Sequence, residues 1–92
     1  MINQCFTLHT DPGHGWLEVT TSQLKTIGLT INDFSSYSYR SGDNVYLEED
    51  CDAGKFVTAY KKKYHKYPEC SDKHTNNDSF VRNLPPIGME VN

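Results

Sequence analysis

Two histidines and an aspartate near the N-terminus have side chains that could bind a metal ion. His9, Asp11 and His14 lie close together in the sequence, and imidazole and carboxylate groups are zinc ligands. With Glu48 they would suffice for a small metal-dependent enzyme, provided that the fold brings them together. The other interpretation is that residues 11–15 (DPGHG) form a hairpin turn and serve its backbone angles. We expect the turn, and we predict no metal, no other cofactor and no catalytic residue.

Acidic residues crowd the junction between an expected strand and an expected helix. Glu48, Glu49, Asp50 and Asp52 follow one another closely, and such a cluster can bind a hard cation, cap a helix or contact a basic partner. The calcium-loop pattern is absent. We expect Asp50 to be the helix N-cap and Asp52 to lie in the first turn, where the helix dipole favours negative charge. Glu48 and Glu49 have no such local role, so they are the stronger candidates for a partner contact.

Aromatic and basic residues in two other segments are typical of binding surfaces. Tyr37 and Tyr39 share one face of an expected strand, with Arg40 beside them, and tyrosine and arginine are common interface anchors. They could instead cover the sheet or stack on nucleic-acid bases. The lysines at 61–63 could contact phosphate or form a solvated helix end. The residues predicted to contact a partner are Glu48, Glu49, Asp52, Tyr37, Tyr39, Arg40, Lys61, Lys62 and Lys63.

Size and composition favour a single small globular domain. The chain has 92 residues, of which 36% are hydrophobic and 23% charged, and its net charge of -3 is too small to indicate a nucleic-acid mimic or a nucleic-acid-binding protein. No apolar run approaches the ~18 residues of a membrane-spanning helix, and the N-terminus lacks a signal-peptide pattern. We therefore expect a cytoplasmic protein without membrane contact. The three cysteines show no metal-site or disulfide pattern, so we predict reduced thiols, two of them buried.

The pattern of apolar residues predicts an α+β fold of the order β-β-α-β-β-α-β. Strands are expected at residues 3–9, 16–19, 35–40 and 44–48, with a fifth at a sheet edge at 69–74, and helices at about 21–27 and 51–64. We expect a small antiparallel sheet of four to five strands, with two helices packed on one face. The domain should span residues 1–86, followed by a flexible tail at 87–92.

Local signals define the ends and the buried face of the expected helices. Thr20 and Gln23 have the spacing of a capping box, and Gly28 stands where a glycine commonly ends a helix. In the second helix, Phe56 and Tyr60 recur at helical spacing and should face the core. These signals make the segment 44–63 the expected centre of the fold.

Four segments of the chain recur together in a group of short phage proteins. They are DPGHGWLEV (residues 11–19), SSYSY (35–39), YLEEDCDA (46–53) and NDSFVRNLP (77–85). In this combination and order the chain resembles short, mostly uncharacterised proteins of phages, prophages and mobile elements. DPGHG alone is also similar to the signature of zinc-dependent cell-wall amidases, whose histidine binds the metal, but here WLEV replaces the glycine and acid that follow it there.

The resemblance implies a viral or mobile-element origin and brings no established activity. By analogy with other small phage proteins, we predict a non-enzymatic inhibitor of a host defence machine, such as a CRISPR surveillance complex, which occupies a nucleic-acid-binding surface. Its partner would be a host protein or nucleoprotein complex; direct contact with nucleic acid and the oligomeric state stay open. The alternatives are a metal-dependent enzyme that uses His9, Asp11 and His14, and a nucleic-acid-binding module.

Overall fold

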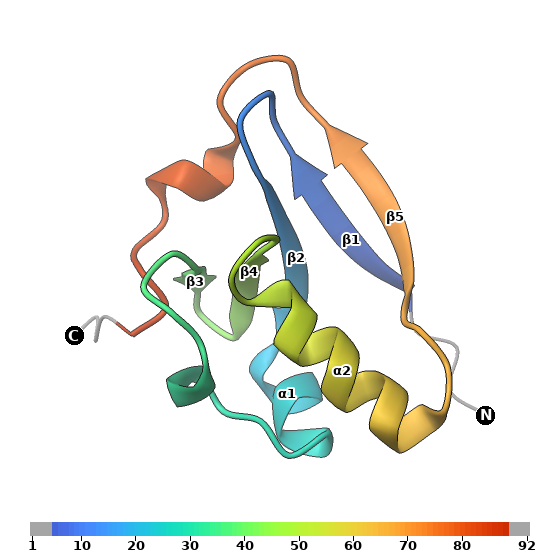
Figure 1. Cartoon of the computed structure of the whole chain (residues 1–92). Coiled ribbons are helices and arrows are strands. Elements are labelled where there is room, and N and C mark those ends of the chain that lie inside the picture. Colours follow the sequence, from blue (N-terminus) through green and yellow to red (C-terminus); the bar gives the residue numbers. More distant parts are fainter. Residues whose placement is uncertain (1–4, 89–92) are drawn as a thin grey trace.

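The computed structural model describes residues 5–88, and its elements follow the predicted order (Figure 1). The strands are β1 (Cys5–Thr10), β2 (Gly15–Thr20), β3 (Tyr39–Ser41), β4 (Asn44–Glu48) and β5 (Glu69–His74). The helices are α1 (Thr21–Thr26) and α2 (Ala53–Tyr64), with two short 3-10 helices, η1 (Ile31–Asp33) and η2 (Phe80–Asn83). The predicted α+β class is therefore confirmed.

The sheet has the strand order β3-β4-β2-β1-β5, with β5 at an edge as predicted. Neighbouring strands are antiparallel except β1 and β5, which run parallel. The prediction of a purely antiparallel sheet is thus wrong for the last strand. The reason is the helical connection, because α2 carries the chain from the end of β4 back along the sheet. The fifth strand therefore starts at the same end as β4 and β1.

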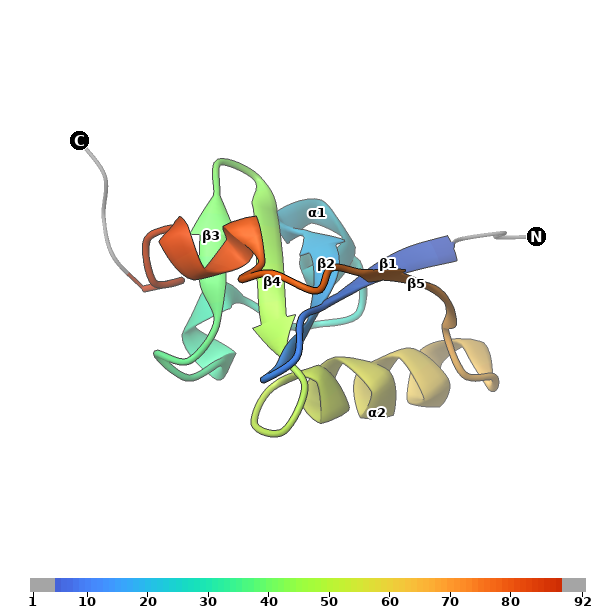
Figure 2. The ribbon, with the colours of Figure 1, turned by 90° about the horizontal axis from the view of Figure 1, so that it is seen from above.

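One face of the sheet packs against both helices. Alternating side chains of the strands, including Phe6, Leu17 and Leu47, join Leu24 of α1 and Phe56 of α2 in one buried cluster. The rings of Phe6 and Phe56 meet edge to face, with centroids 5.2 Å apart. In Figure 2, α2 runs beneath β1 and β5 on this side. The predicted packing of two helices on one face is confirmed, and we call this face the helix side.

The opposite face is covered by the segment that follows β5. Trp16 and Tyr46 point away from the helices and form a second buried cluster with Val81 of η2. Trp16 lies here because successive side chains of a strand point to opposite faces, and its neighbour Leu17 points to the helix side. We call this face the site side.

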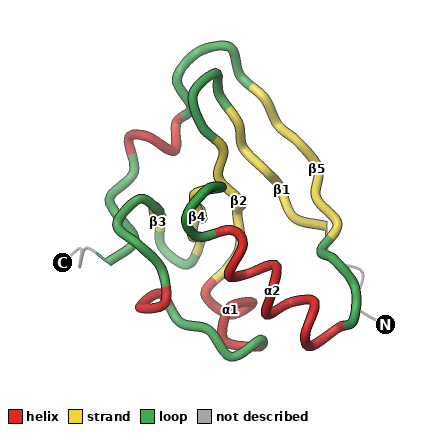
Figure 3. The backbone as a smooth tube through the Cα atoms, viewed as in Figure 1, coloured by secondary structure: helices red, strands yellow, loops and turns green. Residues whose placement is uncertain are grey.

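The third strand and the second helix begin later than predicted. The third strand is limited to Tyr39–Ser41, because the hydroxyls of Ser35 and Ser38 bind Asp52 and turn the chain before it. Figure 3 shows the long loop that precedes β3, interrupted by η1. The second helix begins at Ala53, with Asp52 at the N-cap position but without a side-chain cap. Asp50 is therefore not the helix N-cap, and that prediction is wrong.

The two ends of the predicted domain are only partly described. Ile87 is 1% exposed and belongs to the helix-side cluster, so the packed domain extends past the predicted boundary at residue 86. The rest of the predicted tail, residues 89–92, lies outside the described residues, as do residues 3 and 4 of the predicted first strand.

Both ends of α1 form as the sequence predicts. Thr20 and Gln23 make the reciprocal bonds of a capping box. Gly28 adopts φ +84, and the N–H groups of Gly28 and Leu29 donate to the carbonyls of Lys25 and Leu24. This is a Schellman ending, in which glycine takes the left-handed conformation.

The cysteines and the helix lengths bear on the remaining general predictions. Cys5, Cys51 and Cys70 are free thiols, but all three are exposed, so the predicted burial of two of them is wrong. Within residues 5–88, no helix is both long and apolar enough to pass through a membrane.

Candidate functional site

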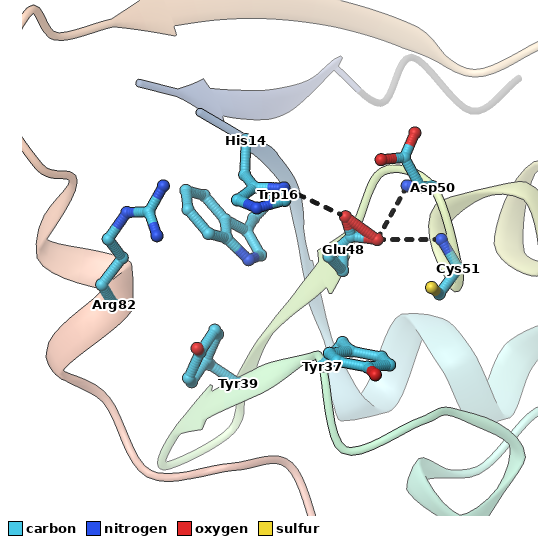
Figure 4. A pocket seen from close by; sticks show the side chains of 8 residues that line it. All are labelled: His14, Trp16, Tyr37, Tyr39, Glu48, Asp50, Cys51 and Arg82. Atoms are coloured by element: carbon cyan, nitrogen blue, oxygen red, sulfur yellow. Dashed lines mark hydrogen bonds and ion pairs between the residues drawn. The ribbon is translucent and has the colours of Figure 1, made fainter. Parts of the chain in front are cut away.

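A pocket of about 250 Å³ opens on the site side of the sheet (Figure 4). It lies between the turn after β1, the end of β4, the loop before β3, and η2. We call it the Trp16 pocket. Its lining residues are His14, Trp16, Tyr37, Tyr39, Glu48, Asp50, Cys51 and Arg82.

Asp11 connects the DPGHG turn to the segment that covers the site side. One carboxylate oxygen accepts from the backbone N–H groups of Gly13 and His14, and the other accepts from the N–H of Ser79. Arg82 donates Nε and Nη2 to the two oxygens at 2.6 and 2.9 Å. The Arg82 guanidinium, followed by the Ser79 N–H, holds the pKa of Asp11 well below its usual range. Asp11 is therefore ionised and fully engaged in structure.

The two glycines of the turn lie close to the ends of neighbouring side chains. A Cβ at Gly13 would stand 2.8 Å from Nη2 of Arg82, and a Cβ at Gly15 would stand 2.7 Å from Oε2 of Glu49. Neither glycine has a positive φ. The DPGHG segment is thus a turn, as predicted, and the long Arg82 and Glu49 side chains would have to shift to accept a Cβ at either glycine.

Glu48 organises the loop between β4 and α2. Its side chain is buried, and Oε1 accepts from the backbone N–H groups of Asp50 and Cys51, each at 2.9 Å. The other oxygen, Oε2, lies 3.7 Å from Nδ1 of His14. The expectation that Glu48 has no local role is wrong. Of the predicted acidic contact residues, Glu49 remains exposed beside it.

Asp52 holds the loop that carries Tyr37. The carboxylate has no exposed surface and accepts from the N–H and hydroxyl of Ser35 and from the hydroxyl of Ser38. Tyr37 lies between these serines, and its N–H donates to Oγ of Ser35. Asp52 therefore offers nothing to a partner directly, contrary to the prediction. It positions Tyr37, whose side chain is 65% exposed.

Trp16 forms the inner wall of the pocket. Its side chain is 2% exposed, the guanidinium carbon of Arg82 lies 5.2 Å from its ring centroid, and the ring of Tyr39 meets it at 6.2 Å. Such a distance between a cation and an indole is favourable. The indole Nε1 is buried and has no hydrogen-bond partner within residues 5–88. In Figure 4 the indole lies between Arg82 and Glu48, with its nitrogen turned toward the side on which Tyr37 and Tyr39 lie.

The pocket contains one thiol and several polar groups, but its chemistry does not indicate a cysteine nucleophile. Partial desolvation, followed by the nearby Glu48 carboxylate, raises the pKa of the Cys51 thiol. A reactive cysteine requires the opposite, a lowered pKa beside positive charge. Cys51 is therefore a protonated thiol at neutral pH. The binding character of the pocket comes instead from its charged groups and aromatic rings.

The fold separates the predicted contact residues into two areas. Tyr37 and Tyr39 line the Trp16 pocket, whereas Arg40 donates Nε to the carbonyl of Gly42 in the β3–β4 turn. The exposed lysines 61–63 lie in the last turn of α2, which leads into β5, and β5 is the edge strand opposite β3 (Figure 1). The tyrosines and the lysines therefore do not form one continuous surface.

The predicted metal set His9, Asp11 and His14 is not assembled. Nε2 of His9 lies 2.6 Å from Oε1 of Glu18, and Asp11 is engaged with Arg82. Of that set only His14 reaches the pocket, where it meets Glu48. The metal-dependent enzyme built on those three residues therefore has no site here.

Sequence reasoning missed Trp16, Cys51 and Arg82 as pocket residues. Arg82 contacts Asp11, a residue far from it in the chain, and no local sequence pattern predicts this contact. Trp16 carried a usable signal, because its alternation with Leu17 places a large aromatic ring on the face that the predicted helices do not cover.

Comparisons with protein-family models, with curated proteins and with solved structures find no match to this chain. The resemblance to phage proteins stays a prediction.

Proposed function

We propose that the chain is a non-enzymatic binding protein of the phage type, which inhibits a host defence complex, such as a CRISPR surveillance complex, by occupying a surface that normally binds nucleic acid. The observation that carries this proposal is Tyr37, an exposed aromatic side chain on a loop that buried Asp52 holds in place. A loop that is already held in place loses little backbone conformational entropy on binding. Tyrosine is also among the residues that dominate interface energies.

The pocket beside Tyr37 supports a protein partner of basic character. Its volume of about 250 Å³ lies below the range of about 300–1,000 Å³ that is usual for small-molecule sites. A hollow of this size suits one or two inserted side chains. Glu49 and Asp50 are exposed next to it, and negative charge favours a partner with basic side chains. Grooves that bind nucleic acid offer such side chains.

A pair of matched tyrosine variants tests this proposal. Tyr37 and Tyr67 are 65% and 64% exposed, but only Tyr37 borders the pocket. Tagged wild-type, Tyr37→Ala and Tyr67→Ala proteins would be used to capture partners from a nuclease-treated lysate of a phage-susceptible host. The affinity of each captured protein would then be measured by calorimetry. We expect Tyr37→Ala to weaken binding by about 10-fold or more, as for an interface hot spot, and Tyr67→Ala to leave it unchanged.

The same experiment can contradict the proposal. Equal affinities for the two tyrosine variants would remove the Trp16 pocket from the interface. A partner that is captured only without nuclease treatment would favour the nucleic-acid-binding alternative. In that case the affinity for plain RNA and DNA should fall steeply with salt, because phosphate contacts release counterions.

A further inference from the structure

A histidine and two carboxylates from separate parts of the chain converge at the mouth of the Trp16 pocket. Each of His14, Glu48 and Asp50 offers a ligand atom, and these atoms all lie within 4.8 Å of one another. His14 comes from the DPGHG turn, Glu48 ends β4, and Asp50 lies in the loop that follows. Nδ1 of His14 and Oε2 of Glu48 are 3.7 Å apart. Two ligands on one tetrahedral zinc ion stand roughly 3.3 Å apart, given bonds of about 2.0–2.1 Å.

The charges around this group favour a cation. Glu48 keeps Oε2 free of hydrogen bonds to the backbone, since Oε1 takes both N–H groups of the loop. Asp50 forms no ion pair within residues 5–88, and the nearby Arg82 is engaged by Asp11. The bond of Glu48 to the loop also fixes its carboxylate, so that one ligand is already oriented.

Trp16 supplies an independent indication of a ligand. Its Nε1 is buried without a hydrogen-bond partner among residues 5–88, and a buried donor without a partner destabilises the folded state. Buried polar groups in proteins are nearly always paired, so an exception requires an explanation. In Figure 4 the nitrogen lies on the edge of the indole that faces Tyr37 and Tyr39, which also line the pocket. A hydroxide or carboxylate carried into the pocket by a metal ion would accept this hydrogen bond after a small movement of the lining side chains.

We propose that His14, Glu48 and Asp50 bind a divalent transition-metal ion, with Zn²⁺ the best match, and that Trp16 donates its indole N–H to a non-protein ligand of that ion. One imidazole and two carboxylates form a ligand set of borderline character that suits zinc better than the hard ions Mg²⁺ and Ca²⁺. Three protein ligands leave at least one coordination position open to the pocket. This set differs from the His9, Asp11 and His14 set of the sequence, and it does not require that the chain bind a host partner.

The single tryptophan of the chain lies beside the proposed site, so its fluorescence reports on binding there. The protein would be treated with a chelator, exchanged into metal-free buffer and titrated with ZnCl₂, with MgCl₂ and CaCl₂ as comparisons. We expect a saturable change in emission, a 1:1 stoichiometry by calorimetry, and reversal by added chelator. His14→Ala and Asp50→Asn should each lower the zinc affinity by at least 10-fold.

Matched variants separate this site from adventitious surface binding. His74→Ala and Asp43→Asn remove an exposed histidine and an exposed aspartate elsewhere, and they should leave the affinity unchanged. Trp16→Phe should lower the affinity measured by calorimetry by about 10-fold, since loss of a group that supports a metal's ligands typically costs 10–100-fold. No saturable zinc binding, or an equal loss in the site and control variants, would overturn the metal site. An unchanged affinity in Trp16→Phe would overturn the part assigned to Trp16.

Discussion

The two sides of the sheet are held together by different physical means. On the helix side, side chains such as Phe6, Leu24 and Phe56 exclude water and form one apolar cluster. On the site side and at the N-terminus of α2, three buried carboxylates bind backbone N–H groups, hydroxyls and a guanidinium from other segments. These are Asp11, Glu48 and Asp52. The difference indicates that these acids position the pocket and the loops around it. The exposed residues on those loops, such as Tyr37, are then the candidates for a partner contact.

Removing an aromatic ring from the helix side should have the largest effect. Phe56 is buried against Phe6 and Tyr60, so Phe56→Ala should lower the free energy of unfolding by about 3–5 kcal/mol. Phe80 provides the matched control, because it is an exposed phenylalanine on the site side. Phe80→Ala should cost far less. Urea titrations of both variants would measure the difference, and equal losses would contradict the assignment of the main core to the helix side.

The pH dependence of stability should identify the contribution of Asp11. Its pKa is lowered in the folded chain, first by Arg82, whereas the unfolded value is near the usual 3.8. A lowered folded pKa stabilises the fold above the unfolded pKa, and this stabilisation is lost as the pH falls below about 4. Wild-type protein should therefore lose thermal stability more steeply between pH 5 and pH 2.5 than Asp11→Asn, which is already less stable at pH 7.

A matched exposed acid tests whether this steep loss belongs to Asp11. Asp78→Asn changes an exposed aspartate near η2 and should keep both the stability and the pH profile of the wild type. If Asp11→Asn and the wild type lose stability in parallel, the contact between Asp11 and Arg82 does not hold the C-terminal segment on the sheet.

The helix side could be predicted from the sequence because its signals are local. The capping box at Thr20, the glycine at Gly28 and the spacing of Phe56 and Tyr60 lie within single elements, and all appear in the structure. The site side depends on contacts between distant segments. From the sequence alone, a carboxylate such as Asp52 is expected to be exposed to solvent. Only the fold brings the Ser35 hydroxyl to it.

The direction of β5 and the role of the acidic segment escaped prediction for related reasons. The strand pattern of Glu69–His74 was recognisable, but parallel pairing follows from the path of α2 across the sheet. Aspartate is a common N-cap residue, which favoured Asp50 as the helix start. In the structure Glu48 binds the N–H groups of the loop, and the helix begins only at Ala53. In both cases the sequence specified the element, and a tertiary constraint specified its geometry.

Two neighbouring acids give the smallest expected effects and the sharpest contrast on the site side. Glu48 is buried and accepts two backbone N–H bonds, so Glu48→Ala should lower the free energy of unfolding by about 1–3 kcal/mol through unsatisfied donors. Asp50 is exposed and caps no helix, so Asp50→Ala should stay within about 0.5 kcal/mol of the wild type. Urea unfolding in chelator-treated buffer would compare the two variants without any contribution from bound metal.

A loss of about 1 kcal/mol in Asp50→Ala would instead indicate that Asp50 caps α2. An undisturbed Glu48→Ala would show that the loop bonds do not hold the pocket. The expected result, a stable Asp50→Ala beside a weakened Glu48→Ala, would assign the structural role to the buried acid and leave the exposed one available for binding.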